Sequence, residues 1–379
     1  MPIQPPLPER YQAMPSRELA QRVQRRKAQL GGDLCILGHH YQSDEVIQFA
    51  DFTGDSLKLS QLAARQSARF IVFCGVHFMA ESADVLTAAE QAVILPNLRA
   101  GCSMAEMVDA ADVQTALAEL ARLSGGRRVV PVTYVNSTAA VKAVTGRSGG
   151  ACCTSSNVRS VFEWAMRPAD QDGAGAEMIF ALPDQHLAMN TAEAMGYGPD
   201  DWVLYQPQRP DGGLTAQQAR RARFVLLGGF CYVHVRFTPQ DVTEVRRRHE
   251  GIQVIVHPEC PREVVRLADA SGSTEQIIRA VEGSPAGSRW AIGTEANLVH
   301  RLAKRLPDRL VRTLSDTPST CWQMASIDLP HLLWVLDNLA EGQVVNQVKV
   351  DQAVAADARL ALERMIRIKA RQDITRISR

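Results

Sequence analysis

The chain has 379 residues, of which 46% are hydrophobic and 22% charged, and its 42 Lys and Arg against 41 Asp and Glu give a net charge of +1. This composition is that of a globular protein, and the length favours two or three domains. The charge gives no indication of nucleic acid or an anionic membrane as a partner. The proline-rich residues 1–8 lack the features of a signal peptide, and no apolar run approaches the roughly 20 residues that span a bilayer. We therefore expect a cytoplasmic protein.

Short apolar runs, each predicted to be a strand, alternate with helical patterns along the chain. The runs are continuous, as in parallel strands that are covered on both faces. Their alternation with helices predicts βαβ units, which we group into three similar α/β units. In chain order the runs are Leu34–Gly38, Phe70–Gly75, Ala92–Pro96, Arg128–Val135, Ala151–Thr154, Met178–Leu182, Phe224–Gly228, Gln253–His257, Leu267–Ser271, Arg289–Gly293 and Leu310–Leu314.

Helix starts and ends can be read at several places between these runs. Ser43 is placed to cap one helix, and Thr238, followed by Pro239, to cap another. Gly251 is expected to end that second helix. The tail from Val350 to Arg371 has sustained helical periodicity and is expected to pack on the body of the protein.

The eight cysteines face a reducing compartment, where buried, catalytic or metal-bound thiols are more common than disulfides. Cys35 and Cys74 lie inside strand-like runs, and the adjacent Cys152 and Cys153 begin another, so we interpret all four as buried packing residues.

Cys102, Cys231 and Cys321 each follow a strand in a small or polar loop, where open α/β sheets place their ligand sites. They lie 129 and 90 residues apart, roughly one for each α/β unit. This spacing is neither a local ferredoxin run nor a zinc pair. Cys260, in the loop after His257, is a rival candidate from the residues alone.

Other reactive side chains recur at strand ends. A single loop Ser or Thr is usually a helix cap, and a lone His is more often structural than catalytic. The collection as a whole suits a substrate that bears phosphate or carboxylate, because hydroxyls and His bind anions while Glu, His and Tyr move protons. Glu81 and Glu295 are weaker additions to the set, whose members are His39, Tyr41, Ser56, Tyr134, Asn136, Ser155, His257, Glu259 and Thr274.

Many ordered motifs between about Leu37 and Asn338 make the sequence resemble the quinolinate synthases, the iron–sulfur enzymes of de novo NAD biosynthesis. They are GHHYQ (38–42), DFTGDS (51–56), VHFMAE (76–81), AGCSMA (100–105), YVNSTAAVKA (134–143), CTSSN (153–157), PDQHLA (183–188), HPEC (257–260), GST (272–274), GTE (293–295) and PSTCWQM (318–324). No one motif decides the matter, but their number and order are specific.

The resemblance implies three αβα domains, each with a small parallel sheet, related by pseudo-threefold symmetry around a central [4Fe–4S] cluster. The implied first domain comprises residues 1–106 and 322–379, the second 107–230 and the third 231–321. One cysteine from each domain would bind the cluster, and the motifs assign Cys102, Cys231 and Cys321 to this role. Cys260 becomes a neighbour of the site.

The implied reaction condenses iminoaspartate with dihydroxyacetone phosphate and releases quinolinate, phosphate and water. Four thiolates would saturate the cluster, whereas three leave one iron open to act as a Lewis acid. By the same resemblance we expect Glu259 to be the main general acid or base, with Tyr41 and His257 as proton-transfer partners. The substrate's anionic groups would be bound by His39, Ser56, Tyr134, Asn136, Ser155 and Thr274. An aspartate oxidase or dehydrogenase would supply the iminoaspartate.

Two departures and two alternatives accompany this interpretation. His40 stands where family members often carry Asn, and no cysteine follows Cys321, so a C-terminal CxxCxxC disulfide switch is not expected. A hydro-lyase that uses an open-iron cluster would share the three cysteines, although the motifs argue against it. An iron–sulfur sensor would need a DNA- or partner-binding element, and the near-zero charge and missing basic helix disfavour that class.

Overall fold

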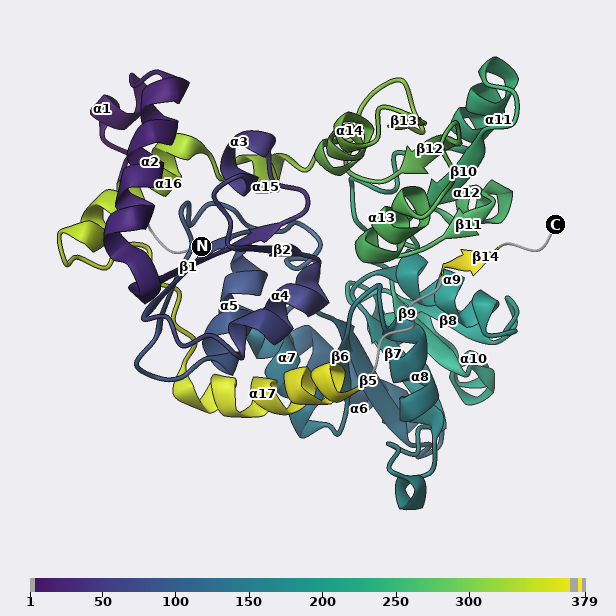
Figure 1. The fold of residues 1–379 in the computed structure, drawn as a ribbon. Coiled ribbons are helices and arrows are strands. Elements are labelled where there is room, and N and C mark those ends of the chain that lie inside the picture. Colours follow the sequence, from purple (N-terminus) through teal and green to yellow (C-terminus); the bar gives the residue numbers. More distant parts are fainter. Residues whose placement is uncertain (1–3, 369–373, 377–379) are drawn as a thin grey trace. The chain divides into compact units, whose positions relative to one another are not determined.

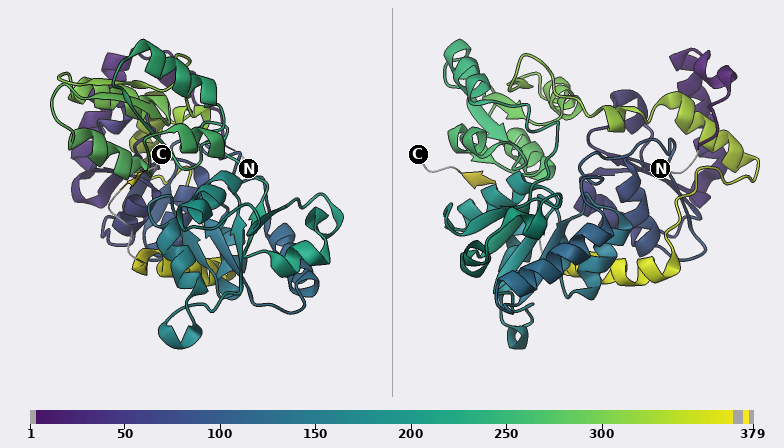
Figure 2. Two further views of the ribbon diagram at one scale, coloured as in Figure 1. Left: turned by 90° about the vertical axis from the view of Figure 1, so that its right-hand side faces the viewer. Right: turned by 180° about the vertical axis from the view of Figure 1, so that it is seen from behind.

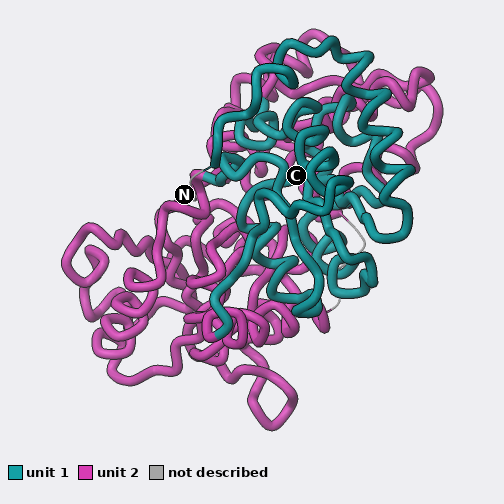
Figure 3. Tube along the Cα trace, turned by 90° about the vertical axis from the view of Figure 1, so that its left-hand side faces the viewer, with its two compact units in different colours: residues 1–102, 320–352 teal, residues 103–319, 353–379 magenta. Residues whose placement is uncertain are grey.

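The computed structural model describes residues 4–368 and 374–376. The chain forms two compact units (Figure 3), which we call unit 1 (residues 1–102 and 320–352) and unit 2 (residues 103–319 and 353–379). The sequence predicted that all of 322–379 belongs to the first domain, whereas the part that follows residue 352 falls in unit 2. The three expected domain boundaries stay a prediction.

Unit 1 contains one parallel sheet of four strands in the order β2-β1-β3-β4 (Figure 1). All six residues of β1 and all five of β3 are buried, as expected for continuous apolar strands with covered faces. The strands are β1 (Leu34–His39), β2 (Phe52–Gly54), β3 (Phe70–Cys74) and β4 (Ala92–Ile94). The helices are α1 (Glu9–Gln12), α2 (Ser16–Leu30), α3 (Asp44–Ile47), α4 (Ser56–Ala63), α5 (His77–Leu86), α15 (Trp322–Ala325) and α16 (Leu329–Ala340).

The first and last segments of unit 1 are joined through Asp337 on α16. The Asp337 side chain is 6% exposed, and its carboxylate accepts hydrogen bonds from Tyr11 (3.0 Å), Arg22 (3.0 Å) and Arg26 (2.7 Å). Helices α2 and α16 lie side by side in the views of Figures 1 and 2. Three donors satisfy this buried carboxylate, so its charge is compensated where the two helices meet, and removing the charge would leave the donors without their partner.

Unit 2 contains two sheets, and the first is all parallel, with the strand order β6-β5-β7-β9-β8. Its strands are β5 (Val129–Tyr134), β6 (Ala151–Cys153), β7 (Met178–Leu182), β8 (Trp202–Tyr205) and β9 (Phe224–Leu227). The helices between them are α6 (Ala110–Leu123), α7 (Ala139–Arg147), α8 (Val158–Met166), α9 (Gln185–Ala194) and α10 (Ala216–Arg221).

The second sheet of unit 2 has the order β13-β12-β10-β11-β14, and only the edge strand β14 is antiparallel. Its strands are β10 (Gln253–Val256), β11 (Ala270–Ser271), β12 (Arg289–Gly293), β13 (Leu310–Thr313) and β14 (Thr375–Arg376). Its helices are α11 (Pro239–Arg248), α12 (Arg262–Leu267), α13 (Thr274–Glu282) and α14 (Ala296–Arg305). Three short 3₁₀ turns complete the described chain, at Gly31–Asp33, Ala169–Gln171 and Pro210–Gly213.

The C-terminal helix α17 (Gln352–Arg367) packs against α7 in the first half of unit 2. Gly146 on α7 makes this approach possible, because a Cβ atom at that position would lie 2.0 Å from the backbone oxygen of Asp357. Arg147 pairs with the Asp357 carboxylate at 2.8 Å, and Arg364 donates to the Gly146 carbonyl at 3.1 Å. The expected C-terminal helix is confirmed up to residue 367, and 369–371 lie outside the described residues.

The predicted α/β architecture with three small parallel sheets is confirmed, and most strands begin where their apolar runs begin. Thr238 forms a capping box with Asp241 ahead of Pro239, as expected. Ser43 precedes α3 without a side-chain capping bond. The run Leu267–Ser271 was predicted as one strand, but Leu267 ends α12 and only Ala270–Ser271 pairs as β11. Among the described residues, no helix combines the length and apolarity needed to cross a membrane.

Candidate active site

The carboxyl ends of the parallel strands in unit 2 carry a group of polar side chains. Tyr134 is the last residue of β5, and Ser155 lies two residues after β6. His257 and Glu259 follow β10, and His234 lies in the segment after β9. Parallel strands end at one edge of their sheet, so side chains from distant parts of the sequence can meet there.

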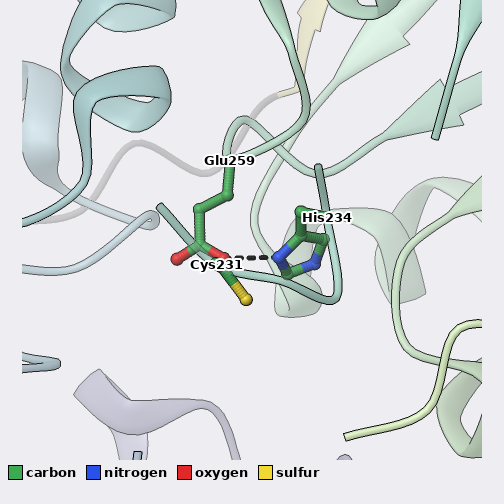
Figure 4. Close-up of side chains that lie close together, drawn as sticks. All are labelled: Cys231, His234 and Glu259. Carbon is green, nitrogen blue, oxygen red and sulfur yellow. Dashed lines mark ion pairs between the residues drawn. The ribbon is translucent and has the colours of Figure 1, made fainter. Parts of the chain in front are cut away.

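Glu259 is the centre of this group and is 2% exposed. Its Oε2 atom lies 2.5 Å from Nδ1 of His234 and 3.5 Å from Nδ1 of His257 (Figure 4 shows the first pair). Tyr134 donates a further hydrogen bond to the same carboxylate. The two imidazole rings stack with their centroids 4.4 Å apart and their planes at 16°. The carboxylate is therefore held by three side chains from two sheets.

Two hydroxyl groups orient the far nitrogens of the imidazoles. Nε2 of His257 lies 3.2 Å from Oγ of Ser155, and Nε2 of His234 lies 3.1 Å from Oγ1 of Thr294. Thr294 follows β12, so the second sheet of unit 2 supplies it. A ring held at both nitrogens keeps its orientation, as proton transfer requires.

The electrostatics of the group favour an ionised Glu259 beside a neutral His257. Burial acts to raise the pKa of Glu259, but the nearby imidazoles and the hydrogen bonds from His234 and Tyr134 outweigh it and lower the pKa to about 2. Burial, and then the electrostatic effect of the neighbouring His234, lower the pKa of His257 to about 3 against the opposing effect of Glu259. The group thus contains a carboxylate that is charged at neutral pH and an imidazole that is not.

Cys231 lies next to this pair (Figure 4), and its sulfur, His234 and Glu259 present donor atoms within 4.8 Å of one another. Such a set has the donor types of a mixed metal site. The Nδ1 atom of His234 and the Oε2 atom of Glu259 are nevertheless only 2.5 Å apart. Ligands that share one tetrahedral ion lie about 3.3 Å apart or more. We therefore interpret His234 and Glu259 as an ion pair beside Cys231 and not as two ligands of one metal ion.

Asp184, the N-cap of α9, is a second buried carboxyl at the site and was missed by sequence reasoning. Its Oδ1 accepts from the backbone N–H of Leu187 at 2.7 Å, and the backbone N–H of Cys231 also donates to this carboxyl. Burial, and then the charge of Glu259, raise the pKa of Asp184 well above its usual value. The PDQ triplet that follows β7 was the available signal, and His234, three residues after Cys231, was missed in the same way.

The remaining predicted residues of unit 2 lie at neighbouring strand ends. Asn136 follows β5 and is half-buried, and its Oδ1 is buried with no hydrogen-bond partner among the described residues. Thr274 opens α13 and is 3% exposed. Beside it, Ser273 accepts a hydrogen bond of 2.8 Å from Ser156, which joins the loops of the two sheets.

Unit 1 holds the other five predicted site residues. The rings of His39 and Tyr41 meet edge to face at 4.7 Å, and the Tyr41 backbone N–H donates to Nδ1 of His39. Ser56 is the first residue of α4, whose N-cap is the Asp55 carboxylate. Cys102 lies in the loop after β4, and Cys321 immediately precedes α15.

The eight cysteines divide cleanly by burial. Cys102, Cys231 and Cys321 are partly exposed, and the other five are buried. The predicted packing role of Cys35, Cys74, Cys152 and Cys153 is confirmed. Burial raises the pKa of Cys35, Cys74 and Cys152 to about 12, and it raises those of Cys153 and Cys260 well above the usual thiol value. A metal ligand must be a thiolate, so these five are poor ligands.

The chain is similar to proteins of one family over almost its whole length. The profile of the family described as Quinolinate synthetase A protein matches residues 21–367. The quinolinate synthase of Acidobacterium capsulatum is 51% identical over 95% of each chain. That of Streptomyces coelicolor is 52% identical over 92% of this chain and 88% of the relative, and that of Geobacillus kaustophilus is 48% identical over 95% and 96%. The chain belongs to the Quinolinate synthetase A protein family.

Proposed function

We propose that this protein is a quinolinate synthase of NAD biosynthesis, which condenses iminoaspartate with dihydroxyacetone phosphate to give quinolinate, phosphate and water. The observation that carries the proposal is the Glu259 carboxylate, held by His234, His257 and Tyr134 beside the partly exposed Cys231. A condensation with loss of water needs groups that move protons, and this arrangement provides them in a buried setting. The relatives are named quinolinate synthases, which supports quinolinate as the product.

We assign Cys102, Cys231 and Cys321 as the ligands of a [4Fe–4S] cluster. The donor chemistry fits, because these are the three cysteines with partial exposure, whereas burial keeps the other five protonated. When bound through three thiolates, such a cluster supplies Lewis acidity at one iron that lacks a protein ligand. Cys260, the rival candidate, is fully buried and lies 3.5 Å from the Gly293 carbonyl, so it packs beside the site.

Glu259 acts as the main general base in this account. A pKa of about 2 makes a carboxylate a weak base by itself. His234, only 2.5 Å away, provides a group to which an accepted proton can pass. His257 is neutral at physiological pH, so either ring nitrogen is able to take part in transfer toward Ser155. Tyr41, in unit 1, is the further proton-transfer partner that we propose.

The remaining site residues would bind the anionic groups of the substrates. Hydroxyl, amide and imidazole groups are suited to carboxylate and phosphate oxygens without adding a permanent charge. Iminoaspartate is unstable in water, so coupling to an aspartate oxidase or dehydrogenase in the cytoplasm forms part of the proposal. The residues assigned to binding are His39, Ser56, Tyr134, Asn136, Ser155 and Thr274.

Substitution of Glu259 by glutamine tests the proposal. Gln keeps the size of the side chain but cannot accept the proton, so turnover should fall by about 100-fold or more while iron and sulfide content stay at the wild-type level. Glu263→Gln is the matched control, because Glu263 is an exposed acid on α12 only four residues away. Near-normal quinolinate formation by Glu259→Gln would remove Glu259 from the mechanism.

A further inference from the structure

Helix α9 follows β7 in the first sheet of unit 2 and contacts the loop that carries His257 and Glu259. The side chain of Asn190, on this helix, is the contact that reaches the loop backbone. We propose that Asn190 is a positioning residue that fixes residues 257–260, and thereby the Glu259 carboxylate, in the orientation that the reaction requires. The inference rests on the proposed function for its catalytic part, but its structural part can be tested separately.

Asn190 uses both hydrogens of one amide on this loop. Its Nδ2 atom donates to the carbonyl of Pro258 at 2.8 Å and to that of Cys260 at 2.9 Å. These carbonyls stand on either side of Glu259 in the sequence, and Asn190 is 7% exposed. Two bonds from one planar group set both the position and the rotation of the peptide segment between them, which is the segment that carries the Glu259 side chain.

At its start this stretch of backbone is attached to the second sheet, because the N–H of His257 donates to the Gly293 carbonyl at 3.0 Å. Among the described contacts of the 258–260 backbone, those other than the Asn190 bonds stay within the loop. The N–H of Cys260 donates to the His257 carbonyl at 3.0 Å, which closes the turn but does not attach it to a neighbouring element. The Cys260 sulfur approaches the Gly293 carbonyl at 3.5 Å, a weak interaction. Removing the Asn190 amide would leave the buried carbonyl of Cys260 and the partly buried carbonyl of Pro258 without this donor, and each such loss is costly. The loop would then relax toward other donors.

The helix that presents Asn190 is anchored at both ends. Asp184 caps its first turn and also accepts from the backbone of Cys231. Near its last turn, Glu193 binds Arg262 through two contacts of 2.7 and 2.9 Å, and Arg262 lies directly after the loop. These contacts hold the helix in place, and the Asn190 amide with it. The position of the amide therefore determines the position of the loop that carries Glu259. Displacement of a catalytic group by about 1 Å can cost about 100-fold in rate.

Three variants separate positioning from general stability. Asn190→Leu keeps the branching of the side chain and removes the donors, and Asn190→Asp keeps the shape but faces the two carbonyls with acceptors. Thr191→Val is the matched control, because Thr191 is also 7% exposed on α9, and its hydroxyl bonds within the helix, to the Leu187 carbonyl at 2.6 Å. Each protein is prepared anaerobically with its cluster, and turnover is expressed for each cluster bound.

The first arm needs no substrate and follows hydrogen exchange of the peptide that covers residues 257–263. We expect faster exchange there in Asn190→Leu and wild-type exchange in Thr191→Val. Unchanged exchange in Asn190→Leu would overturn the structural part of the inference. This arm is decisive even if the wild-type protein forms no quinolinate, in which case the proposed function fails while the anchoring of the loop is still judged.

The second arm is a double-mutant cycle with Glu259→Gln. Asn190→Leu alone should lower kcat by about 10-fold or more, with the KM for dihydroxyacetone phosphate within about twofold of wild type. In the Glu259→Gln background, the same substitution should lower the residual rate by less than about twofold, because there is no base left to position. Losses that multiply in the double variant would show that Asn190 does not act through Glu259 and would refute the catalytic part.

Discussion

Changing His257 to glutamine should flatten the dependence of the unfolding free energy on pH. His257 is buried between His234 and Ser155, and its pKa is lowered from 6.5 to about 3. The unfolded chain therefore binds one more proton than the folded chain at pH values between these two. The unfolding free energy is therefore unaffected by this histidine above pH of about 6.5. It decreases as the pH falls from about 6.5 toward about 3, because protons bind to the unfolded chain and not to the folded one.

The magnitude follows from the two pKa values. Between pH of about 7.5 and about 5.5, one histidine with these values lowers the unfolding free energy by about 1.4 kcal/mol, and by about 2.7 kcal/mol at pH of about 4.5. The number depends almost entirely on the unfolded pKa, because the folded one lies well below this range. Glu259, whose folded pKa of about 2 is also lowered, adds a loss of the same sign below pH of about 4.5.

Urea unfolding of the wild type, His257→Gln and His300→Gln at several pH values measures this effect. His300 is an exposed residue of α14 in the same unit, so its variant controls for the loss of one imidazole. The absolute stability of His257→Gln will fall with the lost contacts, and the readout is the change with pH. If His257→Gln and the wild type lose equal stability between pH of about 7.5 and about 5.5, His257 is not held neutral in the fold.

Two other outcomes can be checked with simple preparations. Maleimide labelling of the native protein should modify Cys102, Cys231 and Cys321 only after a chelator has removed the iron, while the five buried cysteines stay unmodified throughout. Peptide mass spectrometry identifies the labelled residues. Labelling of Cys260 together with these three would contradict their assignment as the cluster ligands. Asp337→Asn should lower the unfolding free energy by about 3 kcal/mol, because it weakens the contacts with Tyr11, Arg22 and Arg26 in a buried setting. Thermal denaturation measures this loss, and Asp316→Asn, which changes an exposed ion pair, is the control. Equal Tm values for the two variants would refute the role of Asp337.

The strands were predictable because their signal is local. Continuous apolar runs such as Met178–Leu182 and Arg289–Gly293 need both faces covered, and the structure places them inside parallel sheets. The edge strands β2 and β8 were missed, since half-exposed positions weaken the apolar signal. The run Leu267–Ser271 was wrongly predicted as one strand because the apolar residues of α12, among them the buried Val264 and Val265, continue without a break into β11.

The candidate site was only partly readable for a different reason. Tyr134, His257 and Glu259 lie in motifs at strand ends, where the position of the loop already suggests chemistry. His234 and Asp184 owe their importance to contacts with residues far away in sequence, and no local pattern reports a 2.5 Å approach between His234 and Glu259. Spacing alone left Cys260 as a rival to Cys102, Cys231 and Cys321, and only the motifs of the resemblance separated them before the structure showed that Cys260 is buried.

Anaerobic purification, followed by iron and sulfide analysis and a quinolinate assay with iminoaspartate generated in situ and dihydroxyacetone phosphate, tests the proposed activity and its cofactor together. Cys102→Ser, Cys231→Ser and Cys321→Ser are assayed beside Cys260→Ser. We expect about four irons for each chain and quinolinate formation in the wild type, with both lost in the first three variants and retained in the fourth. A cluster without quinolinate would favour a hydro-lyase, and a protein that assembles no cluster under any reducing condition would contradict the proposal outright.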